Sequence, residues 1–147
     1  MPAFSVSVGD WPAPFLIKPQ HWNSLHNNYK LGVITNCDTD LFAASNARLG
    51  VTFDWVITAE MAGSYKPDFH NFDVAFATIP VDRSRILHVA QSLFHDHAPA
   101  KSLGMTTVWI DRRHDRVGTG ATPSATVEPD ARYVSLAAFA KAALSAG

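Results

Sequence analysis

Six polar residues whose side chains could take part in chemistry lie close to apolar stretches of the sequence. They are Thr35, Asn36, Lys66, Gln91, Ser92 and Asp96. A hydroxyl and an amide at the end of a strand can hold an anionic oxygen by hydrogen bonds, so Thr35 and Asn36 suit a carboxylate or phosphoryl group. Lys66 supplies a positive charge, and Gln91 and Ser92 can hydrogen-bond a substrate or orient a water molecule. We therefore expect a site for a small anionic substrate.

Four of these six residues also have a structural interpretation. Thr35 and Asn36 can complete a strand-to-helix turn, and Lys66 can be a solvated loop lysine. Asp96 can cap a helix that begins there, because aspartate accepts hydrogen bonds from the free N–H groups of the first turn. That capping role is compatible with a place in the site.

The elements that must position these residues alternate between strand and helix. Apolar runs predict strands over 29–35, 53–58, 86–90 and 106–110. Helices are predicted over 39–49, from Pro67-Asp68, over 96–103 and over 135–145, with loop over most of 111–132. This alternation is typical of a parallel α/β sheet covered on both faces, in which ligands bind beyond the carboxyl ends of the strands.

The chain divides into two parts. Residues 29–147 hold the strand and helix pattern and form the predicted α/β core. Residues 1–28 are predicted to be irregular, because Pro12, Pro14 and Pro19 interrupt them, with a short helix after Pro19.

Three strand-end segments carry a resemblance to a known family. They are Val33-Ile34-Thr35-Asn36, Ser64-Tyr65-Lys66-Pro67-Asp68 and Ala90-Gln91-Ser92-Leu93-Phe94-His95-Asp96. Their order and spacing over roughly 29–113 resemble the second, third and fourth motifs of the haloacid dehalogenase (HAD) superfamily, and most closely its 2-haloacid dehalogenase type II-like branch. The resemblance implies a three-layer, Rossmann-like parallel sheet. It also implies hydrolysis at an activated carbon through an aspartyl-ester intermediate.

The resemblance assigns roles to the six polar residues. Lys66 and Asp96 match catalytic positions, where the family's lysine neutralises the nucleophilic aspartate and the substrate anion. The substrate-binding positions are Thr35, Asn36, Ser92 and Gln91.

A metal ion is not expected at this site. Phosphatase members of the family usually carry Gly-Asp where this chain has Ala90-Gln91, and the neutral Gln91 is a poor ligand for Mg²⁺. Magnesium is expected only if the chain is phosphatase-like, and no other cofactor is implied. His95 and His97 need not converge on one ion from a strand-to-helix junction.

The family's first motif, a strand followed by Asp-x-x-Gly-Thr-Leu, is not found in these 147 residues. Its first aspartate is the nucleophile, so we expect a core incomplete at the N-terminus, without a cap domain and with little or no turnover.

Asp10-Trp11-Pro12 resembles the segment that joins cap to core, so residues 1–28 are interpreted as a remnant of that connection. Because the missing strand lies centrally in this fold, we expect a homodimer through an exposed sheet edge, a replacement strand from residues 1–17, or poor stability.

The composition narrows the classes of partner and compartment. The net charge of −1 argues against a broad nucleic-acid surface, and no apolar run approaches the ~18 residues of a membrane span. Cys37 is the single cysteine, which fits a cytoplasmic protein without disulfides.

Three functional hypotheses remain open. The first is a haloacid dehalogenase-like hydrolase core that is weak or inactive because the nucleophile is missing. The second is a truncated, non-catalytic protein that binds a small anion or a partner. The third is a phosphatase-type HAD hydrolase.

Overall fold

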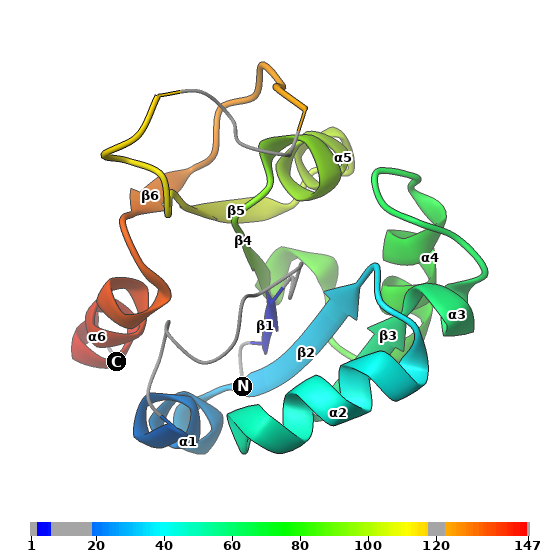
Figure 1. Ribbon diagram of the computed structural model, residues 1–147, viewed down its shortest axis with the longest axis horizontal. Helices are drawn as coiled ribbons and strands as arrows, with labels where there is room; N and C mark the ends of the chain where they lie inside the picture. Colours follow the sequence, from blue (N-terminus) through cyan, green and yellow to red (C-terminus); the bar gives the residue numbers. More distant parts are fainter. Residues whose placement is uncertain (1–2, 7–18, 118–122, 147) are drawn as a thin grey trace.

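The structure is a computed structural model that describes residues 3–6, 19–117 and 123–146. Within these residues, one parallel sheet has the strand order β3-β2-β1-β4-β5-β6 (Figure 1). Its strands are β1 (Ala3–Val6), β2 (Lys30–Thr35), β3 (Trp55–Thr58), β4 (Ile86–Ala90), β5 (Thr106–Ile110) and β6 (Ala131–Tyr133). The predicted three-layer α/β core is confirmed.

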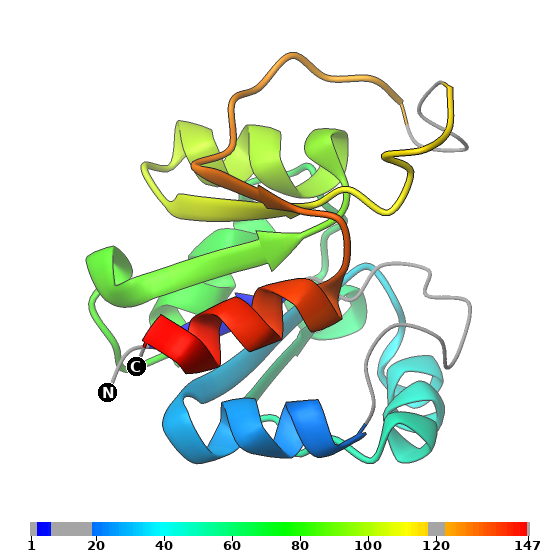
Figure 2. The same ribbon diagram turned by 90° about the vertical axis from the view of Figure 1, so that its left-hand side faces the viewer.

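Helices cover both faces of this sheet. They are α1 (Pro19–Asn28), α2 (Thr39–Leu49), α3 (Ala59–Ala62), α4 (His70–Thr78), η1 (Arg83–Arg85), η2 (Leu93–His97), α5 (Ala98–Ser102) and α6 (Leu136–Ala146). Side chains of α1, α2 and α6 share one hydrophobic cluster, and those of α3, α4 and α5 share another. Figure 2 shows α1 and α6 lying across the first of these faces.

Side chains along each strand point alternately to the two faces of the sheet, so they belong alternately to the two clusters. In β2, Leu31 and Val33 face the α1–α2–α6 side, whereas Ile34 faces the opposite side. In β4, Val89 and Ile86 are divided in the same way. All five side chains are almost fully buried, which explains the short, nearly continuous apolar runs of the sequence.

Strand β1 corrects the prediction that residues 1–28 are irregular. It lies between β2 and β4, and Ala3 is in register with Lys30 on one side and with Ile86 on the other. The expected replacement strand from residues 1–17 is therefore present. Four residues are too short a pattern to predict, and this strand forms because two neighbours pair with it. Helix α1 begins at Pro19, as expected, and Asp10-Trp11-Pro12 lies outside the described residues.

Several local predictions are confirmed and others are corrected. Helix α2 ends at Gly50, whose φ of 63° is a left-handed conformation that favours glycine. Asp38 occupies the N-cap position of α2 without a side-chain capping bond. In α2, Phe42 is buried but Leu41 is exposed, so Phe42 faces the core and Leu41 faces the solvent. Strand β6 overlaps only the last two residues of the segment 111–132, which is predicted to be mostly loop, and ends at Tyr133.

The region around Asp96 also differs from its prediction. The helical segment begins at Leu93 with a π-helical turn, and the Ser92 hydroxyl caps it by accepting a hydrogen bond from the backbone N–H of His95. Asp96 therefore lies inside the helical segment, and the interpretation of Asp96 as an N-cap is wrong.

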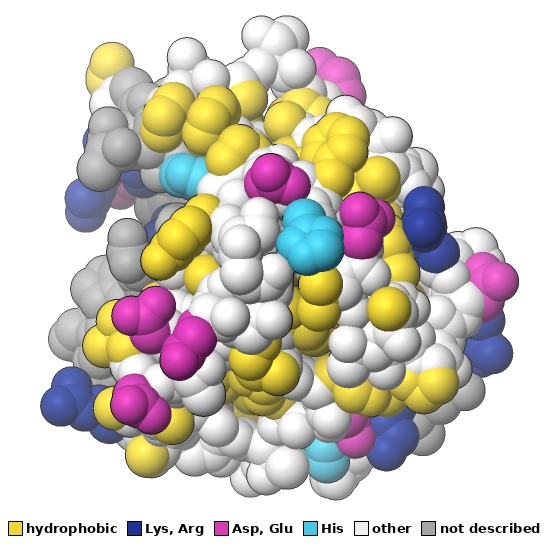
Figure 3. Space-filling model, turned by 90° about the vertical axis from the view of Figure 1, so that its right-hand side faces the viewer, with side chains coloured by type: hydrophobic (Ala, Val, Ile, Leu, Met, Phe, Trp, Pro, Cys, Tyr) yellow, Lys and Arg dark blue, Asp and Glu magenta, His cyan; other side chains and the backbone are white. Residues whose placement is uncertain are grey.

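On the face over α3 and α4, hydrophobic and acidic side chains lie side by side, with Lys and Arg towards the margins (Figure 3). Met61, Tyr65 and Phe69 are among the exposed large hydrophobic side chains of the molecule. In the part of the chain that the structure describes, no helix has the length and apolar character needed to cross a bilayer.

Candidate functional site

The carboxyl ends of β2 and β4 bring together four of the six predicted site residues. Thr35 is the last residue of β2, and Asn36 follows it. Lys66 comes from the loop between α3 and α4, and Asp96 comes from the helical turn after β4. Parallel strands end at the same edge of the sheet, so residues far apart in the sequence meet there.

The centre of this group is an ion pair between Lys66 and Asp96. Lys66 Nζ lies 2.6 Å from Asp96 Oδ1 and also donates a hydrogen bond of 3.0 Å to the carbonyl oxygen of Ile34. The two side chains are 2% and 3% exposed. The interpretation of Lys66 as a solvated loop lysine does not fit this burial.

Electrostatics keep Asp96 ionised in spite of its burial. Burial by itself raises the pKa of the Asp96 carboxyl, because a charge is poorly solvated in the interior. The positive charge of Lys66 and the hydrogen bonds from His88 and Lys66 outweigh burial and hold that pKa well below its ordinary value. The pair is therefore a carboxylate and an ammonium, with no net charge.

Asn36 bonds both backbone groups of Lys66, its N–H and its carbonyl oxygen. The backbone N–H of Lys66 donates to Asn36 Oδ1 at 2.7 Å, and Asn36 Nδ2 donates to the carbonyl oxygen of Lys66 at 3.1 Å. This reciprocal pair fixes the loop after α3 against the end of β2. Asn36 is thus a positioning residue for Lys66.

Thr35 has a structural partner in its own turn. Its Oγ1 accepts a hydrogen bond of 3.2 Å from the backbone N–H of Cys37, and the side chain is fully buried. The strand-to-helix turn that the sequence left open as an alternative is therefore present. A role for Thr35 in substrate binding stays a prediction.

Two buried histidines lie beneath the ion pair and were not predicted as part of it. His88 Nε2 is 3.5 Å from Asp96 Oδ1, and the His88 ring packs edge-on against Phe72. Burial lowers the pKa of His88, although the hydrogen bond and charge of Asp96 act in the opposite direction. The signal that could have identified His88 is an imidazole in the middle of the apolar run 86–90.

His97 is the second buried histidine. Its Nε2 donates a hydrogen bond of 2.8 Å to the carbonyl oxygen of Ala90, at the end of β4. Burial lowers the pKa of His97 from 6.5 to about 4, so this ring is neutral at pH 7. The bond ties His97 to the end of β4.

Gln91 and Ser92 form hydrogen bonds with residues outside the group of Thr35, Asn36, Lys66 and Asp96. Ser92 Oγ is 3.1 Å from His95 Nδ1 besides capping the helical turn. The Gln91 side-chain oxygen accepts a hydrogen bond from Arg112, and its backbone carbonyl oxygen accepts one of 3.0 Å from the Trp109 indole. Both residues line a pocket beside β5 rather than the Lys66–Asp96 pair.

The donor groups at this edge do not suit a magnesium ion. Mg²⁺ needs carboxylate oxygens, but Asp96 is bound by Lys66 and position 91 carries a neutral amide that is bound to Arg112. Across residues 3–6, 19–117 and 123–146, no three His, Cys, Asp or Glu side chains gather as a metal site.

Comparison with known proteins identifies relatives of two activities. No family model matches the sequence. The chain is 33% identical over 109 residues to pyrimidine 5'-nucleotidase YjjG of Escherichia coli (strain K12), which covers 71% of this chain and 48% of the relative. It is 31% identical over 103 residues to (S)-2-haloacid dehalogenase of Pseudomonas sp. (strain YL), which covers 68% of this chain and 44% of the relative. The chain thus spans about half the length of the curated relatives it matches.

Comparison with solved structures also finds a 2-haloacid dehalogenase. The crystal structure of 2-haloacid dehalogenase from Pseudomonas syringae pv. Tomato DC3000 superimposes with a TM-score of 0.66 at 28% identity, covering 87% of this chain and 52% of that one. The order of the three sequence segments, the parallel sheet and these similarities agree. The chain belongs to the haloacid dehalogenase superfamily.

Proposed function

We propose that this chain is the anion-binding core of a haloacid dehalogenase-like hydrolase, and that it has little or no turnover by itself. The observation that carries the proposal is the placement of Lys66 at the carboxyl edge of the sheet by Asn36, Ile34 and Asp96. The substrate class is a small organic acid with a leaving group on an activated carbon. A relative named (S)-2-haloacid dehalogenase supports this class.

In the proposed family chemistry, an aspartate carboxylate attacks the substrate carbon, an ester forms and the leaving group departs with its electron pair. Water then attacks the ester carbonyl, which releases the hydroxy acid and regenerates the carboxylate. The Asp-x-x-Gly-Thr-Leu motif that would supply this carboxylate is not found in the 147 residues. The residues at the site would then bind and orient the anion without forming the ester.

We expect the substrate anion to bind only weakly near Lys66, because of the Lys66–Asp96 ion pair. The charge of Lys66 is balanced by Asp96, so the pair as a whole attracts an anion only at short range. In a complete enzyme of the family, a nucleophilic aspartate beside Lys66 would add a second negative charge that the lysine neutralises. Hydrogen bonds from Thr35 and Asn36 to the substrate carboxylate would supply most of the remaining attraction.

A phosphatase-type activity is the second candidate, because the 33% identical relative is a pyrimidine 5'-nucleotidase. Gln91 counts against it, since a neutral amide bound to Arg112 replaces the acidic residue expected of a magnesium-dependent phosphatase. A non-catalytic anion-binding protein is the third candidate and differs from the first only in having no turnover at all.

One experiment tests the proposal against the phosphatase candidate and measures whether any turnover remains. The purified chain is incubated with 2-chloropropionate or with p-nitrophenyl phosphate and Mg²⁺, and halide or phosphate release is measured. We expect no release above the blank, together with NMR shifts of the Asn36 and Lys66 amides on adding 2-chloropropionate. Halide or phosphate release that Lys66→Met abolishes and Lys101→Met preserves would overturn the proposed inactivity. Absence of both release and shifts would overturn the anion-binding role.

A further inference from the structure

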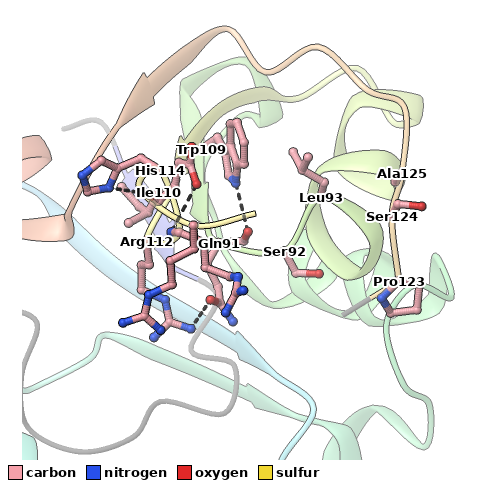
Figure 4. A pocket seen from close by; sticks show the side chains of 13 residues that line it. Gln91, Ser92, Leu93, Trp109, Ile110, Arg112, His114, Pro123, Ser124 and Ala125 are labelled. Atoms are coloured by element: carbon pink, nitrogen blue, oxygen red, sulfur yellow. Dashed lines mark hydrogen bonds between the residues drawn. The ribbon is translucent and has the colours of Figure 1, made fainter. Parts of the chain in front are cut away.

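A pocket of about 290 Å³ lies beside the Lys66–Asp96 pair without including it. Its walls come from 91–93 after β4, from 109–114 and Arg116 at and beyond the end of β5, and from 123–125 (Figure 4). Among the residues that the structure describes, the lining does not include Thr35, Asn36, Lys66 or Asp96. The pocket is therefore a separate place in the molecule, of a size at the lower end of small-ligand sites.

Positive charge dominates the lining. Arg112, Arg113 and Arg116 all contribute to it. The acidic side chain in the described lining is Asp111, and it is bonded to Arg132 at 2.5 Å. Within the described residues, neither Arg113 nor Arg116 forms an ion pair, so their charges are not balanced by a neighbouring carboxylate.

The guanidinium of Arg113 is also incompletely bonded. Its Nη2 donates to the carbonyl oxygen of Val117 at 3.3 Å, but its Nε is buried and has no hydrogen-bond partner among the described residues. A buried donor without a partner costs free energy that an anionic oxygen would recover. Burial also lowers the pKa of Arg112, which shows that this guanidinium lies in a partly dehydrated place where an anion is attracted more strongly than in water.

The other wall of the pocket is apolar and held in place. The Trp109 indole N–H donates to the Gln91 carbonyl oxygen at 3.0 Å, and the Arg132 guanidinium lies 5.3 Å above the ring. Leu93 lies between Trp109 and the segment with Pro123 in the view of Figure 4. A fixed indole and a leucine provide a surface for an apolar or aromatic body.

We propose that this pocket binds an organic phosphate ester. The phosphate dianion would lie against Arg113 and Arg116 with Arg112 beside them, because guanidinium groups bind phosphate through paired N–H donors. The apolar body of the ester would pack on Trp109 and Leu93. Gln91 then has a role other than the predicted substrate binding, since its amide oxygen holds the Arg112 side chain in place. This proposal goes beyond the hydrolase function and does not depend on turnover.

The test is a calorimetric titration of the whole chain with phenyl phosphate, inorganic phosphate and 2-chloropropionate, with the Trp109 indole resonance followed by NMR. We expect phenyl phosphate to bind most tightly and 2-chloropropionate, a monoanion, to bind most weakly. Arg116→Ala should weaken phenyl phosphate binding on the order of tenfold, the usual scale for one charge-assisted hydrogen bond. Arg48→Ala, which removes a cation from α2 outside the pocket, is the matched control and should change nothing.

Gln91→Glu gives a second, nearly isosteric variant. It places a carboxylate against Arg112 and should weaken phenyl phosphate binding by at least as much as Arg116→Ala. The proposal is overturned if phenyl phosphate does not shift the Trp109 indole resonance. It is also overturned if Arg116→Ala and Arg48→Ala change the affinity equally, or if 2-chloropropionate binds as tightly as phenyl phosphate.

Discussion

The ammonium nitrogen of Lys66 lies 2.6 Å from Oδ1 of Asp96, at a place where both side chains are shielded from water. The two residues are 30 positions apart, and they come from opposite sides of β1, because Lys66 follows β3 and α3 whereas Asp96 follows β4. A buried pair of this kind is costly to break, because removal of one partner leaves the other charge without compensation. The stability of the core and the geometry of the site are therefore linked through one contact.

Substitution of Lys66 should destabilise the fold strongly. Lys66→Met leaves the Asp96 carboxylate buried and unpaired, and we expect the free energy of unfolding to fall by about 3 to 5 kcal/mol. Urea unfolding at pH 7 measures this. Lys101→Met is the control, because the Lys101–Asp130 pair is partly exposed to solvent and should contribute at most about 1 kcal/mol. The double variant Lys66→Met/Asp96→Leu should recover much of the loss, and equal costs for the two lysine variants would contradict the prediction.

Stability should fall between about pH 6.5 and pH 4. The pKa of His97 is lowered from 6.5 to about 4 in the folded state, so the unfolded chain binds this proton more readily than the folded chain. The folded state then loses about 3 kcal/mol as the pH falls across this window, and the contribution is level below it. His88, whose pKa is also lowered by burial, acts in the same direction.

Asp96 has its effect in a more acidic range. Its lowered pKa stabilises the folded state at pH values above the ordinary pKa of aspartate, and this contribution is lost only as the pH falls below that value.

Urea unfolding at pH 7, 5.5 and 4.5 checks the stability loss expected from the buried histidines. His97→Gln should flatten the pH dependence, whereas the exposed His70→Gln should leave it unchanged. A stability that is constant from pH 7 to 4.5 would show that the buried histidines do not have the expected effect.

Loss of the Asn36 side chain should loosen Lys66 without removing its charge. Asn36→Ala deletes both hydrogen bonds to the Lys66 backbone, and we expect a loss of about 1 to 3 kcal/mol in unfolding free energy. The NMR shifts caused by 2-chloropropionate should weaken in parallel. Asn28→Ala is a suitable control, since Asn28 donates a single exposed bond within α1. If both variants are equally stable, the Asn36 bonds do not position the loop.

Interruption of β1 should expose the edges of the strands beside it. Ser5 is in register with Gly32 of β2 and His88 of β4, and Ser5→Pro removes a backbone donor from the middle of the sheet. We expect a loss of about 2 kcal/mol or more and dimers or larger species by light scattering, because unpaired edges associate. Thr126→Pro, in an exposed segment without regular structure, is the control. A Ser5→Pro variant that stays monomeric and fully stable would show that β1 is not needed in the sheet.

The alternation of strands and helices can be predicted from the sequence, and so can the edge of the sheet where polar residues gather. The runs 86–90 and 106–110 match β4 and β5 residue for residue. Buried parallel strands are short and apolar throughout, so this information is local to each strand. The three segments around Asn36, Lys66 and Asp96 carried the family resemblance in the same way.

The partners that these residues take depend on the three-dimensional fold and cannot be predicted from the sequence. Strand β1 was not predictable from four residues, because its pairing with β2 and β4 depends on strands that are distant in the sequence. Asp96 pairs with Lys66 instead of capping a helix, since Ser92 begins the helical turn four residues earlier. Gln91 bonds to Arg112 for a similar reason: the end of β5 lies beside the end of β4, and the sequence alone does not show which side chains meet there.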